Sequence, residues 1–425
     1  MSNKINPRLL AVKALCRVDS EGSYSNITLN ALLSEYSVSN EDKALCSKIF
    51  YTTLDRKITI DYILSKFINK GFNKIKPFTL NVLRSAVCQI RFMDKIPDSA
   101  AVNEAVKLIK SSKESFNSGF VNGVLRNILR SELSLPEGND IKSLSVRFSC
   151  PDEIVFSLTR DYCAENTEKF LQNSLLPPPT YIRVNTHKTD PDSLITAFSA
   201  KGIKAEITGL DGCLRVSGYS AIDELPEFKN GLFFVQDISC QTAVSMLSVK
   251  KGDRVLDLCS APGGKAFSAY LSAPDTEIIA TDLYPKRVNL ITEGSKRLGF
   301  SNIKAMPLDA TEFSDSLGFF DKVICDVPCS GLGVIRRKPE IKYKEMDDFS
   351  ELSKIQLSIL EAADKYLKYG GYLLYSTCTL RKAENDELVG AFLKKHDNYS
   401  LISEKTFMPH IDGSDGFFAA IIKKN

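Results

Sequence analysis

Residues Phe320 to Gly333, with the sequence FDKVICDVPCSGLG, contain an apolar run that stops abruptly at polar residues. Residues 323–325 (VIC) predict a short buried strand. Pro328 fixes φ and removes a backbone donor, so we expect Asp326 and Cys329 to lie on a stiff turn after this strand. In open α/β folds, ligands bind at this carboxyl edge of the sheet. An acid and a thiol placed there are candidates for catalysis, although most buried cysteines are small apolar core residues.

The C-terminal part of the chain, residues 236–425, alternates apolar runs with helical periodicity, as a doubly wound α/β fold does. The closing segments 400–404 and 417–423 predict an antiparallel hairpin at the sheet edge. The expected parallel strands are residues 254–258, 277–281, 302–306, 322–325 and 372–376, and the expected helices are 265–271, 285–298 and 347–368.

A nucleotide-like ligand is indicated where three of these strands end. The first is followed by CSAPGGK (Cys259–Lys265), whose adjacent glycines let the backbone approach a ligand at the start of a helix. Asp282 ends the second strand and can accept from ribose hydroxyls, and Asp309 follows the third and can accept from an adenine amino group. The dinucleotide motif G-x-G-x-x-G is absent, which argues against a dehydrogenase. Asp257, at the end of the first strand, is a third acid at this edge, and the alternative is that it serves only to shape its loop.

A second thiol, Cys378, follows the fifth expected strand in the sequence YSTCT, with Glu384 and Asn385 shortly after it. Cys329 and Cys378 should therefore lie on one sheet edge with the ligand. The chain has only three histidines, none of them spaced as a pair, and its cysteines lack the paired spacing of a zinc site. We expect no metal, and two thiols beside an acid favour covalent catalysis.

The first third of the chain is helical and basic. Residues 7–134 show apolar positions at threes and fours with breakers between the runs, which predicts a helical bundle up to about residue 140. Residues 1–150 carry 22 Lys and Arg against 14 Asp and Glu, a net charge of +8, whereas residues 151–425 carry 33 against 38, a net charge of −5. This asymmetry favours a polyanionic partner for the N-terminal part, although scattered solvated lysines would give the same count.

A small α+β module is expected between residues 145 and 235. A strand at 180–186, a helix at 191–201 and extended segments at 205–208 and 213–217 suggest it. Arg183 and Asn185 are two residues apart, so they share one face of their strand. That face suits a nucleic-acid backbone, and it is equally common on half-exposed strands.

Composition and termini restrict the class of protein. The chain has 425 residues, 25% charged and 43% hydrophobic, with no apolar run of about 18 residues and no signal-peptide pattern at its start. Eleven cysteines at irregular spacing suggest reduced thiols. We therefore expect a cytoplasmic protein that has no membrane segment.

Several motifs carry a resemblance to known families. The stretches VNEAVKLIK and FVNGVLRNILR resemble the NusB-like helical domain of RNA-binding proteins. The motifs CSAPGGK, DVPCSGLGVIRRKPEI, YSTCT followed by EN, and DGSDGFF resemble the methyltransferases that make 5-methylcytosine in RNA, in particular their bacterial 16S ribosomal RNA branch. The resemblance implies three parts: an all-α NusB-like domain at 1–140, a small α+β module at 145–235, and a Rossmann-like methyltransferase domain at 236–425.

The resemblance also implies a reaction and its residues. S-adenosylmethionine would be the cofactor, 16S ribosomal RNA in naked or early-assembly form the partner, and a monomer the acting species. Cys378 would be the nucleophile that adds to C6 of cytosine, Asp326 would bond to the base, and Cys329 would assist loss of the C5 proton and release of the product. The cofactor would be held by Cys259, Ser260, Ala261, Pro262, Gly263, Gly264, Lys265, Asp282, Asp309 and Asp326.

Other functions remain open at the level of sequence. One is methylation of a cytosine in transfer RNA or another RNA, or of a small molecule. Another is a NusB-like RNA-binding regulator without catalysis. Arg126 and Arg130, four residues apart near Lys110, could contact phosphates in either case or could be solvated charges. The sequence does not identify the target cytosine.

Overall fold

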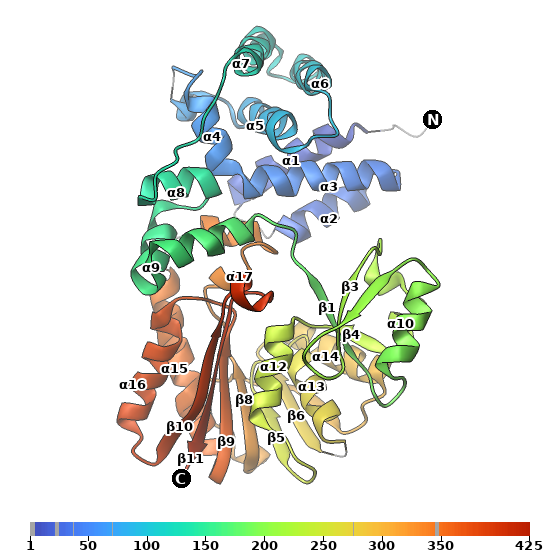
Figure 1. Cartoon of the computed structure of the whole chain (residues 1–425), viewed down its shortest axis with the longest axis vertical. Helices are drawn as coiled ribbons and strands as arrows, with labels where there is room; N and C mark the ends of the chain where they lie inside the picture. Colours follow the sequence, from blue (N-terminus) through green and yellow to red (C-terminus); the bar gives the residue numbers. More distant parts are fainter. Residues whose placement is uncertain (1–4, 22–24, 37, 70, 275, 345–347) are drawn as a thin grey trace. The chain divides into compact units, whose positions relative to one another are not determined.

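A computed structural model gives the fold of the chain and describes residues 5–21, 25–36, 38–69, 71–274, 276–344 and 348–425 (Figure 1). The chain divides into two compact units. The helical unit comprises Met1–Leu175 and Ile335–Lys344, and the second unit comprises Leu176–Val334 and Glu345–Asn425.

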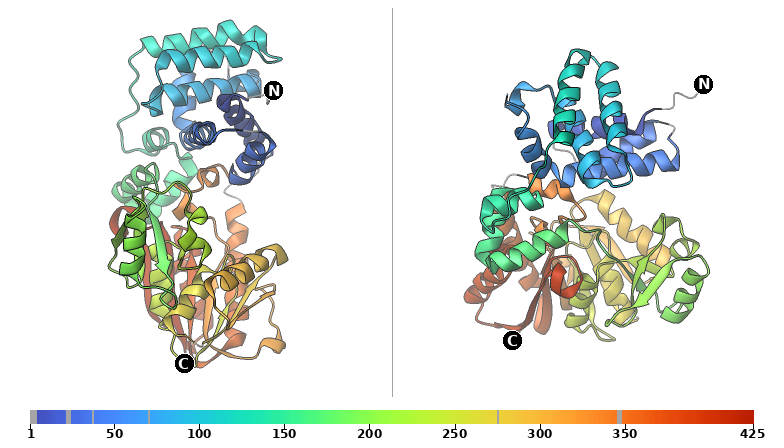
Figure 2. Two further views of the ribbon diagram at one scale, coloured as in Figure 1. Left: turned by 90° about the vertical axis from the view of Figure 1, so that its right-hand side faces the viewer. Right: turned by 45° about the horizontal axis from the view of Figure 1, so that its top comes forward.

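The helical unit is organised around α5 (Pro77–Phe92), which begins with a proline in its first turn and is buried along most of its length. α5 packs against α1, α3, α4, α6 and α7. Figure 2 shows α6 and α7, in cyan to turquoise, side by side as the outer layer of this unit. The predicted helical bundle is therefore confirmed. Its other helices are α1 (Pro7–Glu21), α2 (Ser25–Glu35), α3 (Asn40–Asp55), α4 (Lys57–Ser65), α6 (Asp98–Lys110), α7 (Ser118–Arg130), α8 (Ile141–Phe148) and α9 (Asp152–Ser174).

Residues 335–344 belong to the helical unit although they follow the Cys329 motif in sequence. Lys342, in the 3-10 helix η6 (Pro339–Tyr343), is only 1% exposed, and its Nζ donates to the Asp55 backbone oxygen and to Asp55 Oδ1, both at 2.7 Å. The Tyr343 hydroxyl donates to the Leu54 backbone oxygen at 2.8 Å. The sequence prediction places these residues in the methyltransferase domain. These contacts join residues 287 and 289 positions apart, so local patterns cannot reveal them.

The second unit begins with a four-stranded antiparallel sheet in the order β2-β3-β1-β4. Its apolar face packs around Phe198 of α10 and Phe233 of β4, whose rings meet edge to face at 5.6 Å. The elements are β1 (Thr180–Val184), α10 (Pro191–Ser199), β2 (Lys204–Ile207), β3 (Cys213–Ser217), α11 (Pro226–Lys229) and β4 (Phe233–Val235), which agrees with the predicted α+β module.

Asn185 is not available to a nucleic acid, contrary to one of the two readings of this strand. Its side chain is fully buried, and Nδ2 donates to the backbone oxygens of Gly231 at 2.8 Å and Leu298 at 2.9 Å. The Arg183 guanidinium donates to the Asp211 backbone oxygen. Alternation along a strand gives the face of a side chain, but it does not reveal which chain segment covers that face.

A seven-stranded sheet in the order β10-β11-β9-β8-β5-β6-β7 forms the core of the second unit (Figure 1). β9, β8, β5, β6 and β7 pair in parallel, and β10, β11 and β9 pair antiparallel, so the predicted edge hairpin is confirmed. The strands are β5 (Arg254–Asp257), β6 (Glu277–Asp282), β7 (Ile303–Pro307), β8 (Phe320–Asp326), β9 (Leu367–Thr377), β10 (Tyr399–Phe407) and β11 (Phe417–Lys424).

Helices flank this sheet, as the alternating pattern predicts. The long helix expected at 347–368 is observed from Asp348, since residue 347 lies outside the described residues. These helices are α12 (Ile238–Leu247), α13 (Gly264–Ser272), α14 (Pro285–Leu298), α15 (Asp348–Tyr366), α16 (Asp386–Lys395) and α17 (Pro409–Asp412).

None of the described helices is both long enough and apolar enough to cross a lipid bilayer. Within the described part of the chain, no cluster of three or more His, Cys, Asp or Glu side chains has the arrangement needed to bind a metal ion.

Candidate active site

The carboxyl ends of neighbouring parallel strands bring the predicted site residues together. β5 pairs with β8 through Asp257 and Ile324, and β8 pairs with β9 through Asp326 and Ser376. The loops that follow these strands therefore start at one edge of the sheet. Asp326 ends β8, and the two predicted cysteines lie in the loops after β8 and β9.

The two cysteines touch. Cys329 Sγ and Cys378 Sγ are 3.2 Å apart, and both side chains are half-buried. The Gly333 amide donates to the Cys378 backbone oxygen at 3.0 Å. A Cβ at Gly333 would lie 1.9 Å from the Gly416 backbone oxygen, so only glycine permits this close approach of the two chains. Backbone packing therefore fixes the separation of the two thiols.

The environment distinguishes Cys329 from an ordinary exposed thiol. Its hydrogen bond with Cys378 and its burial raise the pKa of the Cys329 thiol well above its usual value. Burial likewise raises the pKa of Cys259 and of Cys325. All three are therefore thiols at neutral pH, and Cys329 in particular is suited to hold or carry a proton.

Asp326 is held by a buried cation. Lys265 Nζ lies 2.6 Å from Asp326 Oδ2, and the Ser376 hydroxyl donates to Asp326 Oδ1 at 2.8 Å. Burial by itself would lower the pKa of Lys265, but the Asp326 carboxylate and neighbouring groups raise it above its usual value overall. Lys265 is therefore a permanent cation, and it fixes the orientation of the carboxylate that, by the family resemblance, is expected to contact the base.

Glu384 and Asn385, to which the sequence assigns no role, organise the cysteine loops. Glu384 Oε2 accepts from the Ser330 amide at 2.9 Å and from Gln356 Nε2 at 3.0 Å, next to Cys329. Asn385 bonds to residues on both sides of Cys378: Thr377 Oγ1 donates to Asn385 Oδ1 at 2.6 Å, and Asn385 Nδ2 donates to the Thr379 backbone oxygen at 3.1 Å. The EN pair at a fixed distance after YSTCT was the signal for them.

We predict that Glu384→Gln lowers the turnover number for methyl transfer by about 10- to 100-fold. The Glu384 carboxylate accepts from Ser330, Gln356 and Arg381, whereas a glutamine amide would direct a donor at one of these donors. Steady-state kinetics measure the effect. Glu387→Gln on the exposed face of α16 is the matched control, and equal rates for both variants would contradict the role of Glu384.

The predicted cofactor loop lies between the ends of β5 and β6. The Ser260 amide donates to the Thr281 backbone oxygen at 2.8 Å, and α13 begins at Gly264 with Gly263 at a φ of 108°. Asp282, only 2% exposed, ends β6 with its carboxylate 3.3 Å from Arg287 Nη1. Free helix N–H groups and several carboxylates at one sheet edge form a donor set that suits a nucleoside bearing a positive charge, as S-adenosylmethionine does.

Asp309 lies slightly apart from this loop. The neighbouring Leu308 amide donates to the Asp282 backbone oxygen at 3.1 Å, which places the segment beside β6. The Asp309 carboxylate itself is exposed and accepts from the Thr311 amide at 2.9 Å and from the Thr311 hydroxyl at 2.7 Å. Its contact with an adenine therefore stays a prediction.

Asp257 makes the stability of the fold depend on pH. It is fully buried, and this burial raises its pKa to about 7, against the opposing effect of Lys265. Because the folded-state pKa is the higher one, the contribution of this carboxyl group to stability is fully present below about pH 4 and is lost as the pH rises through 7.

We predict that Asp257→Asn abolishes this loss, since an amide does not ionise. From pH 5 to pH 8, the free energy of unfolding of the wild type should fall relative to the variant by about 2–4 kcal/mol, measured by urea titration. Parallel pH profiles for the two proteins would contradict the buried, neutral carboxyl group.

Comparison with known proteins assigns the family. The family described as "16S rRNA methyltransferase RsmB/F" matches residues 244–423, the NusB family matches residues 5–130, and a ferredoxin-like domain of the same methyltransferases matches residues 151–223. A Bacillus subtilis protein, "Probable ribosomal RNA small subunit methyltransferase B", is 36% identical and covers 99% of both chains. The chain belongs to the ribosomal RNA small subunit methyltransferase B family. A Citrobacter koseri member is 31% identical over 99% of this chain and 100% of its own length.

Solved structures agree with this family in fold. The crystal structure of PH0851 superposes with a TM-score of 0.82 at 24% identity and covers 100% of both chains. A structure described as NSun6 from Pyrococcus horikoshii with SFG has a TM-score of 0.60 at 23% identity, over 64% of this chain and 98% of its own. The three-part fold, with a NusB-like domain, a ferredoxin-like module and a methyltransferase domain, is thus confirmed, and the family is one of S-adenosylmethionine-dependent RNA methyltransferases.

Proposed function

We propose that the chain transfers a methyl group from S-adenosylmethionine to C5 of one cytosine in 16S ribosomal RNA through a covalent adduct with Cys378. The observation that carries the proposal is the pair of thiols 3.2 Å apart at the ends of β8 and β9, beside a carboxylate that Lys265 and Ser376 orient. Membership of the methyltransferase B family supports 16S ribosomal RNA as the substrate.

The chemistry explains why these groups are required. C5 of cytosine is a poor nucleophile, and addition of the Cys378 thiolate to C6 makes C5 electron-rich. When bound, S-adenosylmethionine supplies a methyl group activated by its sulfonium charge. Asp326 accepts from the N4 amino group and so orients the base for attack, and the Lys265 ammonium, 2.6 Å from Asp326 Oδ2, opposes the build-up of negative charge as the thiolate adds.

The adduct must then be resolved. After C5 has gained the methyl group it must lose its proton, and the electrons of the C5–H bond then restore the C5–C6 double bond as the Cys378–C6 bond breaks. Cys329, 3.2 Å from Cys378 and held as a thiol, is placed to give its proton to the departing Cys378 sulfur and to take the C5 proton in exchange. Because the thiol adds from above the ring, the base must first leave its stack.

Residues of the loop 259–265 would hold the cofactor, together with Asp282, Asp309 and Asp326. Asp282 would accept from the ribose hydroxyls, and the first turn of α13 would face the carboxylate end of the amino acid moiety. Lys265 serves the base-binding side of the same site, because its Nζ contacts Asp326.

The experiment is methyl transfer from tritiated S-adenosylmethionine to naked 16S RNA and to 30S particles, taken from a strain that lacks the gene. We expect label in one of the two, recovered as 5-methylcytidine after nucleoside digestion and assigned to one position by bisulfite sequencing. Label in neither substrate, or in a nucleoside other than 5-methylcytidine, would overturn the proposal.

A further inference from the structure

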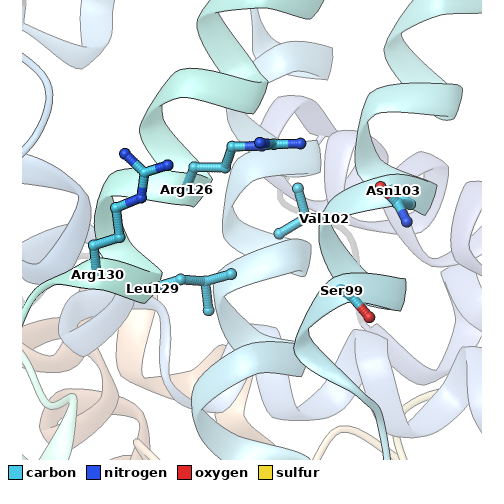
Figure 3. Close-up of a pocket in the computed structure, with 6 residues that line it drawn as sticks. All are labelled: Ser99, Val102, Asn103, Arg126, Leu129 and Arg130. Atoms are coloured by element: carbon cyan, nitrogen blue, oxygen red, sulfur yellow. The ribbon is translucent and has the colours of Figure 1, made fainter.

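The outer layer of the helical unit contains a cavity of about 230 Å³ between α6 and α7. It is lined by Ser99, Val102, Asn103, Arg126, Leu129 and Arg130. Figure 3 shows Arg126 reaching from α7 toward Val102 and Asn103 of α6, with Arg130 one turn further along α7. Two guanidinium groups and two small polar side chains thus border one surface hollow.

Both arginines have guanidinium N–H donors that form no hydrogen bond with the described residues. Within the described part of the chain, one hydrogen bond involves the Arg126 side chain, from Nε to Asn122 Oδ1 at 3.0 Å, and Figure 3 shows its guanidinium reaching from α7 toward α6. Among the described residues, no carboxylate forms an ion pair with Arg126 or Arg130. Glu104 of α6 is engaged by Lys107 at 2.7 Å and by Asn6 at 3.0 Å. The pair therefore presents two uncompensated positive charges to a ligand.

One face of α7, the α7 stripe, carries no side chains along its first half. It comprises Gly119, Gly123, Arg126 and Arg130, which follow each other at intervals of four, three and four residues and so share one helix face. Gly119 and Gly123 are exposed, and a Cβ added at either would have no heavy atom within 4 Å. Glycine weakens a helix relative to alanine, and nothing in the described structure requires it here. A partner backbone that approaches the helix closely would require it.

We propose that Arg126 and Arg130 bind neighbouring phosphates of the RNA substrate, and that its sugar-phosphate backbone runs along the glycine half of the α7 stripe. The inference rests on the proposed function, which supplies an RNA partner. Guanidinium groups match phosphate oxygens bidentately, and the net charge of +8 on residues 1–150 attracts a polyanion. An acidic protein would also suit the charge, but the bare glycine stripe favours a thin backbone over a surface of side chains.

The first test is the double variant Arg126→Gln/Arg130→Gln, with naked 16S RNA as the probe in filter binding at several KCl concentrations. We expect at least a tenfold loss of affinity, a salt slope reduced by about 1.4–1.8 for two lost phosphate contacts, and a raised KM with kcat retained at saturating RNA. The control is Lys43→Gln/Lys48→Gln, which removes two exposed charges from α3. Wild-type affinity, or an equal loss in the control, would overturn the proposal.

The second test separates stability from binding. Gly123→Ala should raise the melting temperature by about 2–4 °C and at the same time weaken RNA binding, because the new methyl group occupies the path of the RNA backbone. A purely structural role for this face predicts higher stability with unchanged affinity, and that result would overturn the proposal. Binding is measured without turnover, so these outcomes are independent of whether cytosine C5 is the methylated atom.

Discussion

Cys378→Ala is expected to reduce methyl transfer to 16S RNA by more than about 1000-fold, because no other thiolate can take its place at C6. Cys329 is the nearest thiol, at 3.2 Å, but its raised pKa keeps it protonated. The variant should still bind S-adenosylmethionine, because residue 378 is not among the predicted cofactor residues. Tritium incorporation measures transfer, and equilibrium dialysis measures cofactor binding.

The control for this variant is Cys240→Ala, which removes a different thiol beside the same cluster. Cys240 Sγ lies 3.8 Å from Lys265 Nζ, and burial raises the pKa of Cys240 to about 12, so it is inert as a nucleophile. Its loss should leave the rate within a few-fold of the wild type. Retained turnover in Cys378→Ala would remove Cys378 from the mechanism.

Cys329→Ala is expected to trap the enzyme on its RNA. Without this thiol, attack by Cys378 and methylation proceed, but proton loss from C5 and release of Cys378 slow by orders of magnitude. The adduct should appear as a slow-migrating, RNase-sensitive band in denaturing gels. Its yield should depend on S-adenosylmethionine and disappear in Cys378→Ala/Cys329→Ala.

A Cys329→Ala protein that turns over normally and forms no such band would assign Cys329 a packing role only. Its contact with Cys378 would then serve the fold, as would the hydrogen bond at 2.7 Å between the neighbouring Ser330 and Thr379 hydroxyls.

The sheet and its edge were predictable from local patterns. An apolar run that ends in a polar residue identified the ends of β5, β6 and β8, and parallel pairing brings such ends together whatever the details of packing. Asp326, Cys329 and Cys378 therefore converge as the sequence predicts. The motifs that resemble RNA methyltransferases added the roles, which neither spacing nor composition could supply.

The residues that escaped prediction act across long distances in sequence. Asn185 alternates as an exposed strand residue would, yet Gly231 and Leu298 cover it. Lys342 has the sequence context of a solvated lysine, yet it is buried against Asp55 in the helical unit. Lys265 was predicted to hold the cofactor. Its ion pair with Asp326 depends on how β5 pairs with β8, and the sequence does not give that register.

The central claim is that the sulfur of Cys378 bonds to C6 of a cytosine in 16S RNA. It is tested most directly with 16S RNA that contains 5-fluorocytidine, since fluorine at C5 cannot leave as a proton does and the adduct persists. After reaction with S-adenosylmethionine and digestion, tandem mass spectrometry should locate a methylated fluorocytidine on Cys378. The same nucleoside attached to Cys329, or the absence of any protein-bound nucleoside, would contradict the account.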